Sequence, residues 1–166
     1  AVGTGTLGLH SLFMKKRIVY GSLESFYLNN EIFKKMQKGC EEANIWLADV
    51  LGVPDGIKKA GLHLRNATTM FSPPTKSSTE LSRETPTEGI NLETALVKVK
   101  ESAGGELFRI NYEFLKLMKE RGMYNEEEIA RIAKNKGSCQ DCDWLTDHEK
   151  TVFRIAFEIP MDKHVE

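Results

Sequence analysis

The sequence predicts a helix-rich α/β fold. Apolar residues recur at three- and four-residue spacing over most of the 166 residues, which is the period of helices that bury one face. One run, residues 64–71 (LRNATTMF), breaks this rhythm with threonine and apolar residues before a double proline, as a buried strand does. No internal repeat or low-complexity block is present. We therefore expect residues 1–166 to form one domain, or a piece of one.

Composition and charge exclude several classes of protein. Lys and Arg (23) balance Asp and Glu (24), so no basic excess drives binding to nucleic acid or to a membrane surface. No apolar run approaches the length of a membrane span, and no charged-then-apolar leader opens the chain. Three cysteines without disulfide spacing fit a reducing compartment. We expect a cytoplasmic protein with no membrane partner and no direct nucleic-acid partner.

The two ends of the chain indicate a segment of something longer. The chain opens with AVGTGTLGLHSLFMKK, without an initiator methionine, and closes on MDKHVE directly after a helical pattern. Neither end carries a tail or a stop signal for the last helix.

A long helix is expected near the N-terminus. Ser22 can cap it, and it runs to Gly52 and the VPDG turn. Because about thirty residues is long for a globular helix, a break near Asn29 and Asn30 is plausible. Its apolar stripe consists of Ile32, Met36, Cys40, Ala43, Leu47 and Val50.

Three further helices are expected after the double proline. The first ends at Gly122; its apolar stripe is Leu107, Ile110, Phe114, Leu117 and Met118. Asn125 caps the second, and residues 126–128 (EEE) form a solvated start that complements its dipole. Thr146 and Glu149 form a capping box for the last helix. That helix buries Val152, Phe153, Ala156 and Ile159.

The stretch SPPTKSSTE predicts a strand, a tight turn and a fresh helix within residues 64–84. Pro73 and Pro74 end the strand, because proline lacks an amide hydrogen and disfavours helix before it. Ser77 and Glu80 have the spacing of a capping box, which starts the helix.

Hydroxyls, a cation and the positive end of a helix dipole converge on this turn, as an anionic phosphate requires. The residues around the free amides are Thr75, Lys76, Ser77, Ser78 and Thr79. The alternative is a capped surface helix whose serines serve only the backbone.

Five segments, in order and spacing, resemble the later part of the large subunit of class I ribonucleotide reductase. They are GTGTLGLHSLF, RIVYGSLES, LRNATTMFSPPTKSSTE, GGELFRINYEFLKLMKERGMYNEEEIARIAKNKGSCQ and LTDHEKTVFRIAFEI. The resemblance implies the C-terminal half of a ten-stranded α/β barrel. It also implies that Thr75, Lys76, Ser77 and Ser78 contact the diphosphate of a ribonucleoside diphosphate.

The chain departs from this family in two ways. Lys76 stands where the family usually has a small or hydroxylated residue, and it either adds a charge-assisted contact or points outward. No part of the chain matches the Asn-x-Cys-x-Glu turn of the radical cysteine, and the radical-relay tyrosine pair would lie beyond Glu166. We therefore expect no catalytic residue and no metal ligand in this segment, which holds substrate but does not reduce it alone.

The resemblance also implies partners. They are the rest of the large subunit, a radical-generating small subunit that contains metal, thioredoxin or glutaredoxin as thiol reductant, and nucleotide effectors such as ATP. The implied activity is allosterically controlled deoxyribonucleotide synthesis for DNA replication. The segment itself binds no cofactor directly. The alternative is a stand-alone helical phosphate-binding or interaction module without catalysis, which predicts a monomer with a sealed apolar surface.

The remaining cysteines, histidines and tryptophans are expected to be structural. Cys139 and Cys142 form a C-x-x-C motif, but one such motif without a second pair is a weak signal for a metal or redox site. Cys40 lies on an apolar stripe and is expected in the core. No histidine shows metal spacing, and both tryptophans are expected to pack. These residues are His10, His63, His148, His164, Trp46 and Trp144.

Overall fold

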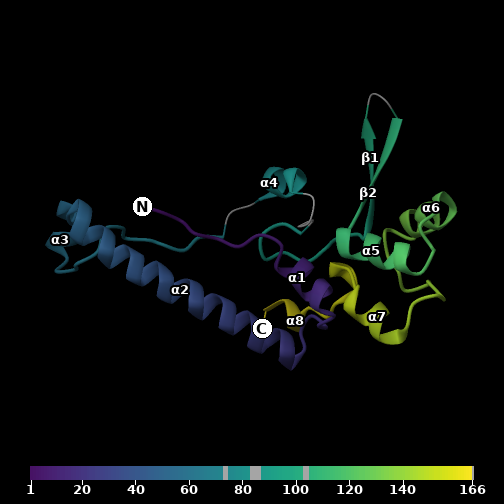
Figure 1. Ribbon diagram of the computed structural model, residues 1–166, viewed down its shortest axis with the longest axis horizontal. Helices are drawn as coiled ribbons and strands as arrows, with labels where there is room; N and C mark the ends of the chain where they lie inside the picture. Colours follow the sequence, from purple (N-terminus) through teal and green to yellow (C-terminus); the bar gives the residue numbers. More distant parts are fainter. Residues whose placement is uncertain (73–74, 83–86, 103–104, 166) are drawn as a thin grey trace. The chain divides into compact units, whose positions relative to one another are not determined.

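The computed structural model describes residues 1–72, 75–82, 87–102 and 105–165. The chain divides into two compact units. Unit 1 consists of Ala1–Thr6 and Phe26–Pro74, and unit 2 of Leu7–Ser25 and Thr75–Glu166. Figure 1 labels the helices and strands of both.

A single long helix supplies most of unit 1. Helix α2 (Leu23–Leu51) runs without interruption for 29 residues and is followed by the short helix α3 (Asp55–Lys59) (Figure 1). The predicted cap is confirmed, because the Ser25 amide donates to Ser22 Oγ at 3.2 Å. The predicted break at Asn29 and Asn30 is wrong. An asparagine inside a helix costs no more than about 0.7 kcal/mol, which does not end a helix by itself.

The expected strand at residues 64–71 forms only one bridge. Met70 pairs in parallel with Thr4, where the Thr4 amide donates to the Thr69 carbonyl at 2.9 Å and the Phe71 amide donates to the Thr4 carbonyl at 3.1 Å. Pairing is this short because a strand needs a neighbour along its whole length, and the described part of the chain provides one only at residues 2–4. The prolines at 73 and 74 lie outside the described residues.

Asn44 of α2 holds the segment before this bridge. Its side-chain oxygen accepts from the Asn66 amide at 2.7 Å and from the Arg65 amide at 3.2 Å, and its Nδ2 donates to the Asn66 carbonyl at 2.9 Å. Asn44 is buried, so each bond replaces one that water would otherwise make. Cys40, expected in the core, is only half-buried.

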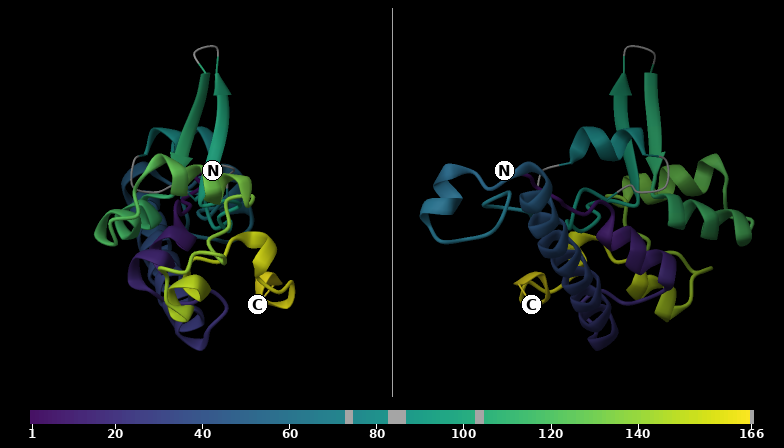
Figure 2. Two further views of the ribbon diagram at one scale, coloured as in Figure 1. Left: turned by 90° about the vertical axis from the view of Figure 1, so that its right-hand side faces the viewer. Right: turned by 60° about the vertical axis from the view of Figure 1, so that its left-hand side comes forward.

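A β-hairpin in unit 2 replaces part of a predicted helix. Strands β1 (Val97–Ser102) and β2 (Gly105–Ile110) pair antiparallel, with Val97 opposite Ile110. The helical stripe expected to include Leu107 and Ile110 is therefore wrong over those two residues. The alternation VKVKES, followed by glycine, was the available signal for a strand and turn. Figure 2 shows the hairpin projecting from unit 2.

Seven helical segments of unit 2 surround the base of the hairpin. They are α1 (Leu9–Lys16), α4 (Lys76–Leu81), α5 (Tyr112–Glu120), α6 (Glu126–Lys134), α7 (Asp147–Val152), the 3₁₀ helix η1 (Ala156–Glu158) and α8 (Asp162–Val165). Both later predicted caps are confirmed: Asn125 Oδ1 accepts from the Glu128 amide at 2.8 Å, and Thr146 with Glu149 forms the capping box. No described helix is both long and apolar enough to cross a membrane.

The core of unit 2 centres on Phe114. Its ring lies 5.4 Å from that of Phe153 and 5.9 Å from that of Trp144, centroid to centroid. The predicted burial of Phe114, Leu117, Met118, Val152, Phe153 and Ile159 is confirmed. Ala156 is only half-buried, and α7 ends at Val152, so the last helix is shorter than predicted. Trp144 packs as predicted. The prediction that Trp46 packs is wrong, since 61% of its surface is exposed.

Gly137 joins α6 to the base of the hairpin. Its carbonyl accepts from the Leu96 amide at 2.9 Å, and its amide donates to the Ile132 carbonyl at 2.8 Å. Its φ is +77°, and an added Cβ would lie 2.5 Å from Ala95 Cβ and 2.8 Å from the Val97 carbonyl oxygen. No side chain therefore fits at this position.

We expect Gly137→Ala to lower the free energy of unfolding by more than the roughly 1–2 kcal/mol that a left-handed residue costs, because the methyl also overlaps backbone. The matched control is Gly39→Ala in α2, where nothing lies within 4 Å of an added Cβ. That variant should gain about 0.5–1 kcal/mol. Urea unfolding followed by circular dichroism measures both, and equal effects of the two variants would contradict the close packing at Gly137.

Candidate functional site

The N-terminus of α4 carries the residues predicted to hold phosphate. The first amide with a partner inside the helix is that of Thr79, which donates to the Thr75 carbonyl at 2.8 Å. The amides of Lys76, Ser77 and Ser78 precede it and have no carbonyl one turn back within the helix. The first turn contains no acidic residue, and a negative charge there would compete with an anionic ligand.

The helix begins two residues earlier than the predicted capping box requires. Thr75 occupies the cap position, and no side chain caps the helix there. Ser77 lies inside α4, so a box that starts at Ser77 is wrong. Thr75 takes the cap position because its carbonyl accepts from both the amide and the hydroxyl of Thr79, each at 2.8 Å, so the first bond of the helix forms before Ser77. The Thr75 hydroxyl is buried and has no hydrogen-bond partner among the described residues.

Thr79 and Arg109 anchor this short helix on unit 2. The Thr79 side chain is 1% exposed. Arg109 of β2 donates from Nη2 to the Thr79 carbonyl at 3.4 Å, which ties the end of α4 to the hairpin. The side chains of Lys76, Ser77 and Ser78 stay on the surface. The sequence placed Thr79 in the turn without its anchoring role, and it did not single out Arg109, which belongs to no motif.

A second polar cluster lies buried beneath the hairpin. Glu93 is 2% exposed, and it pairs with Lys98 Nζ at 2.6 Å and accepts from Asn111 Nδ2 at 3.0 Å. Its own amide donates to His10 Nδ1 at 2.9 Å. A buried carboxylate needs a cation and hydrogen-bond donors nearby, and Lys98 and Asn111 supply them to Glu93.

His10 is the neutral member of that cluster. It is 1% exposed, and its Nδ1 accepts a hydrogen bond, so the ring proton is on Nε2, which has no partner among the described residues. Burial lowers the pKa of His10 from 6.5 to about 4. His10 is thus structural, as predicted.

The C-x-x-C cysteines are buried and held by a charged cluster. Both thiols are 0% exposed; burial raises the pKa of Cys142 to about 11 and that of Cys139 further still. Cys142 accepts from Arg131 Nη2 at 3.2 Å. Such thiols carry almost no thiolate at neutral pH, so they are poor nucleophiles and poor metal ligands. Among the described residues, no cluster of His, Cys, Asp or Glu has the size of a metal site.

Glu128 is the centre of this charged cluster, and not a solvated helix start. It is 8% exposed, and its carboxylate receives two hydrogen bonds from Arg131, at 2.6 and 2.9 Å, and one from Trp144 Nε1 at 2.7 Å. The bonds from Arg131 lower the pKa of Glu128, and they outweigh the opposite effect of burial. The prediction of three solvated glutamates is therefore wrong for Glu128, which turns inward to meet Trp144.

Comparison with known proteins assigns the family. The family model described as ribonucleotide reductase, barrel domain, matches residues 1–56 and 52–166, which together cover the chain. The chain belongs to the ribonucleotide reductase family. It is 29% identical over 165 residues to the ribonucleoside-diphosphate reductase large subunit of Invertebrate iridescent virus 6, and 26% identical over 195 residues to that of Caenorhabditis elegans.

A solved ribonucleotide reductase shares the fold. The class Id ribonucleotide reductase alpha subunit of Actinobacillus ureae matches 93% of this chain with a TM-score of 0.79 and 32% sequence identity. This confirms the prediction of a helix-rich segment of the reductase barrel. The chain spans 17% and 24% of the length of the two reductase relatives, and 27% of that of the solved subunit.

The buried His10 makes the stability of unit 2 fall in mild acid. Its folded pKa of about 4 lies below the unfolded value of 6.5, so only the unfolded chain takes up a proton between those values. We expect the contribution of His10 to be complete above pH 6.5 and to decline by up to about 1.4 kcal/mol per pH unit down to pH 4.

His10→Asn keeps an acceptor for the Glu93 amide and removes the titration, so its unfolding free energy should depend less steeply on pH over this range. Gly39→Ala, which changes no titratable group and has nothing within 4 Å of the added Cβ, should keep the wild-type slope. Urea titrations at pH 4.5, 5.5 and 7 measure the slopes, and an unchanged slope in His10→Asn would refute the assignment.

Proposed function

We propose that this chain is the part of a ribonucleoside-diphosphate reductase large subunit that holds the diphosphate of the substrate, at Thr75, Lys76, Ser77 and Ser78. The observation that carries the proposal is the start of α4. Three successive amides without a helical partner, no acidic residue in the first turn and the unpartnered Thr75 hydroxyl form a site for an anion. Family membership of the whole chain supports phosphate as that anion.

The hydrogen-bond donors of this turn suit a diphosphate. Backbone amides and hydroxyls at a helix start donate to phosphate oxygens, and the helix dipole favours the negative charge. Lys76 is exposed, as Ser77 and Ser78 are, and its ammonium adds a charge-assisted contact to a bound diphosphate. Thr79 and Arg109 hold the turn in place but do not belong to its ligand set.

The reduction itself needs groups outside this chain. In the complete enzyme, a cysteine radical activates the ribose and a cysteine pair supplies the electrons, while a metal-containing small subunit generates the radical. Thioredoxin or glutaredoxin renews the cysteine pair, and nucleotide effectors such as ATP regulate the enzyme. The product is a deoxyribonucleotide for DNA replication in the cytoplasm. This chain contributes binding and orientation of substrate, which lowers the entropic cost of the reaction.

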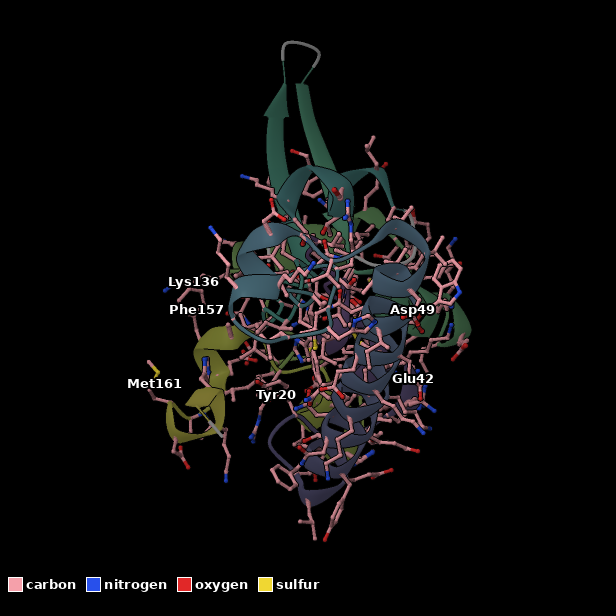
Figure 3. All side chains as sticks on the ribbon, turned by 90° about the vertical axis from the view of Figure 1, so that its left-hand side faces the viewer. Tyr20, Glu42, Asp49, Lys136, Phe157 and Met161 are labelled. Atoms are coloured by element: carbon pink, nitrogen blue, oxygen red, sulfur yellow. The ribbon has the colours of Figure 1, made fainter. Side chains whose placement is uncertain are left out.

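Exposed apolar side chains support a place inside a larger subunit. Trp46, Val50 and Leu51 at the end of α2 are each more than half exposed, at 61%, 59% and 58%. Phe157 and Met161 of unit 2 are 86% and 75% exposed, and Figure 3 shows the Met161 side chain standing clear of the ribbon. A stand-alone module is expected to cover such residues, so these surfaces favour contact with the rest of the large subunit.

Thr75→Val tests the diphosphate site. We expect a nucleoside diphosphate to bind the variant about tenfold more weakly, because one hydrogen bond to a charged oxygen, worth about 1.5 kcal/mol, is lost. Isothermal titration calorimetry with a nucleoside diphosphate and with the unphosphorylated nucleoside measures the effect. Thr68→Val, an exposed threonine of unit 1, is the matched control. Equal affinity of the wild-type chain for the two ligands would refute the proposal.

Trp46→Gln with Val50→Gln tests the apolar surface. We expect the wild-type chain to self-associate when purified alone, and the double variant to do so at a several-fold higher concentration with unchanged helix content. Both side chains lie mostly in solvent, so their loss removes adhesive area without opening a cavity. Sedimentation velocity and circular dichroism give the two readouts. A wild-type monomer at all concentrations would favour the stand-alone module.

A further inference from the structure

A cavity of about 230 Å³ lies in unit 2, between the turn that precedes α2 and the segment from α7 to α8. Tyr20 and Ser22 line it on one side, and Thr151, Arg154 and Lys163 on the other. It is smaller than the roughly 300–1,000 Å³ of sites for drug-sized ligands, so it suits a compact group. Its lining shares no residue with the turn at the start of α4.

The lining of this cavity is cationic. Arg154 and Lys163 contribute two positive charges, and no aspartate or glutamate is among the lining residues that the structure describes. No hydrogen bond or ion pair to the Arg154 guanidinium forms within the described part of the chain. Lys163 Nζ lies 4.0 Å from the Asp162 carboxylate, whose side chain is 68% exposed. A half-buried guanidinium without a partner favours an anionic ligand.

The Lys163 side chain packs on Gly21 at the edge of the cavity. The φ of Gly21 is +76°, and an added Cβ would lie 3.0 Å from three carbons of the Lys163 side chain. The aliphatic part of Lys163 therefore packs directly on the backbone of the turn, and its ammonium is kept near the cavity.

Tyr20 is the neutral donor of the cavity. Its hydroxyl has no hydrogen-bond partner in the part of the chain that the structure describes. Burial raises the pKa of this phenol, which therefore stays protonated and able to donate. The other two hydroxyls serve the backbone: Ser22 Oγ accepts from the Ser25 amide at 3.2 Å, and Thr151 Oγ1 donates to the Asp147 carbonyl at 2.8 Å.

We propose that this cavity binds a phosphate group, with Arg154 as its two-pronged ligand, Lys163 as a second charge and Tyr20 as a neutral donor. A guanidinium presents parallel N–H groups that match two phosphate oxygens. The phosphate is either free or carried by a small phosphomonoester. The proposal does not depend on the diphosphate site at Thr75.

The test is a titration of the full chain with inorganic phosphate, and separately with ribose 5-phosphate, at constant ionic strength. Calorimetry gives the affinity, and amide chemical shifts give the location. We expect saturable binding of at least one ligand, with shifts centred on residues 19–22 and 151–154. Arg154→Gln should weaken binding at least tenfold. The ligand with the higher affinity shows whether the cavity takes free phosphate or a phosphomonoester.

Two controls keep the outcome decisive. Lys134→Gln removes the same unit charge at an exposed site outside the cavity, so it should retain wild-type affinity. The shift map uses the wild-type chain, so it remains valid if Arg154→Gln fails to fold. Shifts only at residues 75–78 would support the proposed function and overturn the second site. Equal loss in Lys134→Gln and Arg154→Gln, or no saturable binding of either ligand, would overturn it as well.

Discussion

Unit 2 depends on the hydrogen bonds of one buried residue, Asn111. Its amide donates to the Leu96 carbonyl at 2.7 Å, which closes the base of the hairpin, and its side-chain oxygen caps α5 by accepting from the Glu113 and Phe114 amides. Its Nδ2 donates to Glu93. Because a buried amide side chain left unpaired costs about 1–3 kcal/mol, the strand, the helix and the carboxylate must stay in register with one another.

Strand β2, which ends directly before Asn111, also positions the proposed diphosphate site. Arg109 lies two residues before Asn111 and donates to the Thr79 carbonyl. This hydrogen bond holds the short helix α4 in place and leaves the first amides of α4 available. Six residues are too few for a helix to be stable alone. The binding turn of this reductase segment is therefore held by tertiary contacts and not by its own helical propensity, which keeps its donors in place before a ligand arrives.

The two cysteines of the C-x-x-C motif show how burial decides the role of a reactive group. With both thiols in the core and Arg131 bound to Glu128, the motif closes the loop between α6 and α7 and contributes packing. Arg154 presents the opposite case. It lies directly after the buried Phe153 and lines the cavity beside Tyr20, where no carboxylate among the described lining residues neutralises it. Chemistry follows the surroundings of each side chain more than its type.

The sequence alone determined the features that depend on near neighbours in the chain. The caps at Ser22, Asn125 and Thr146 follow from bonds that span three residues. The family resemblance rests on contiguous motifs, and the phosphate role of the TKSS turn stays a prediction. Tertiary structure decided the rest. Glu128 turns inward because it accepts a hydrogen bond from Trp144, which lies sixteen residues further along the chain. Residues 105–110 form a strand because Val97–Ser102 pairs with them. Whether a side chain is buried, a strand is paired or a charge lacks a partner depends on residues far away in the sequence, which local periodicity does not encode.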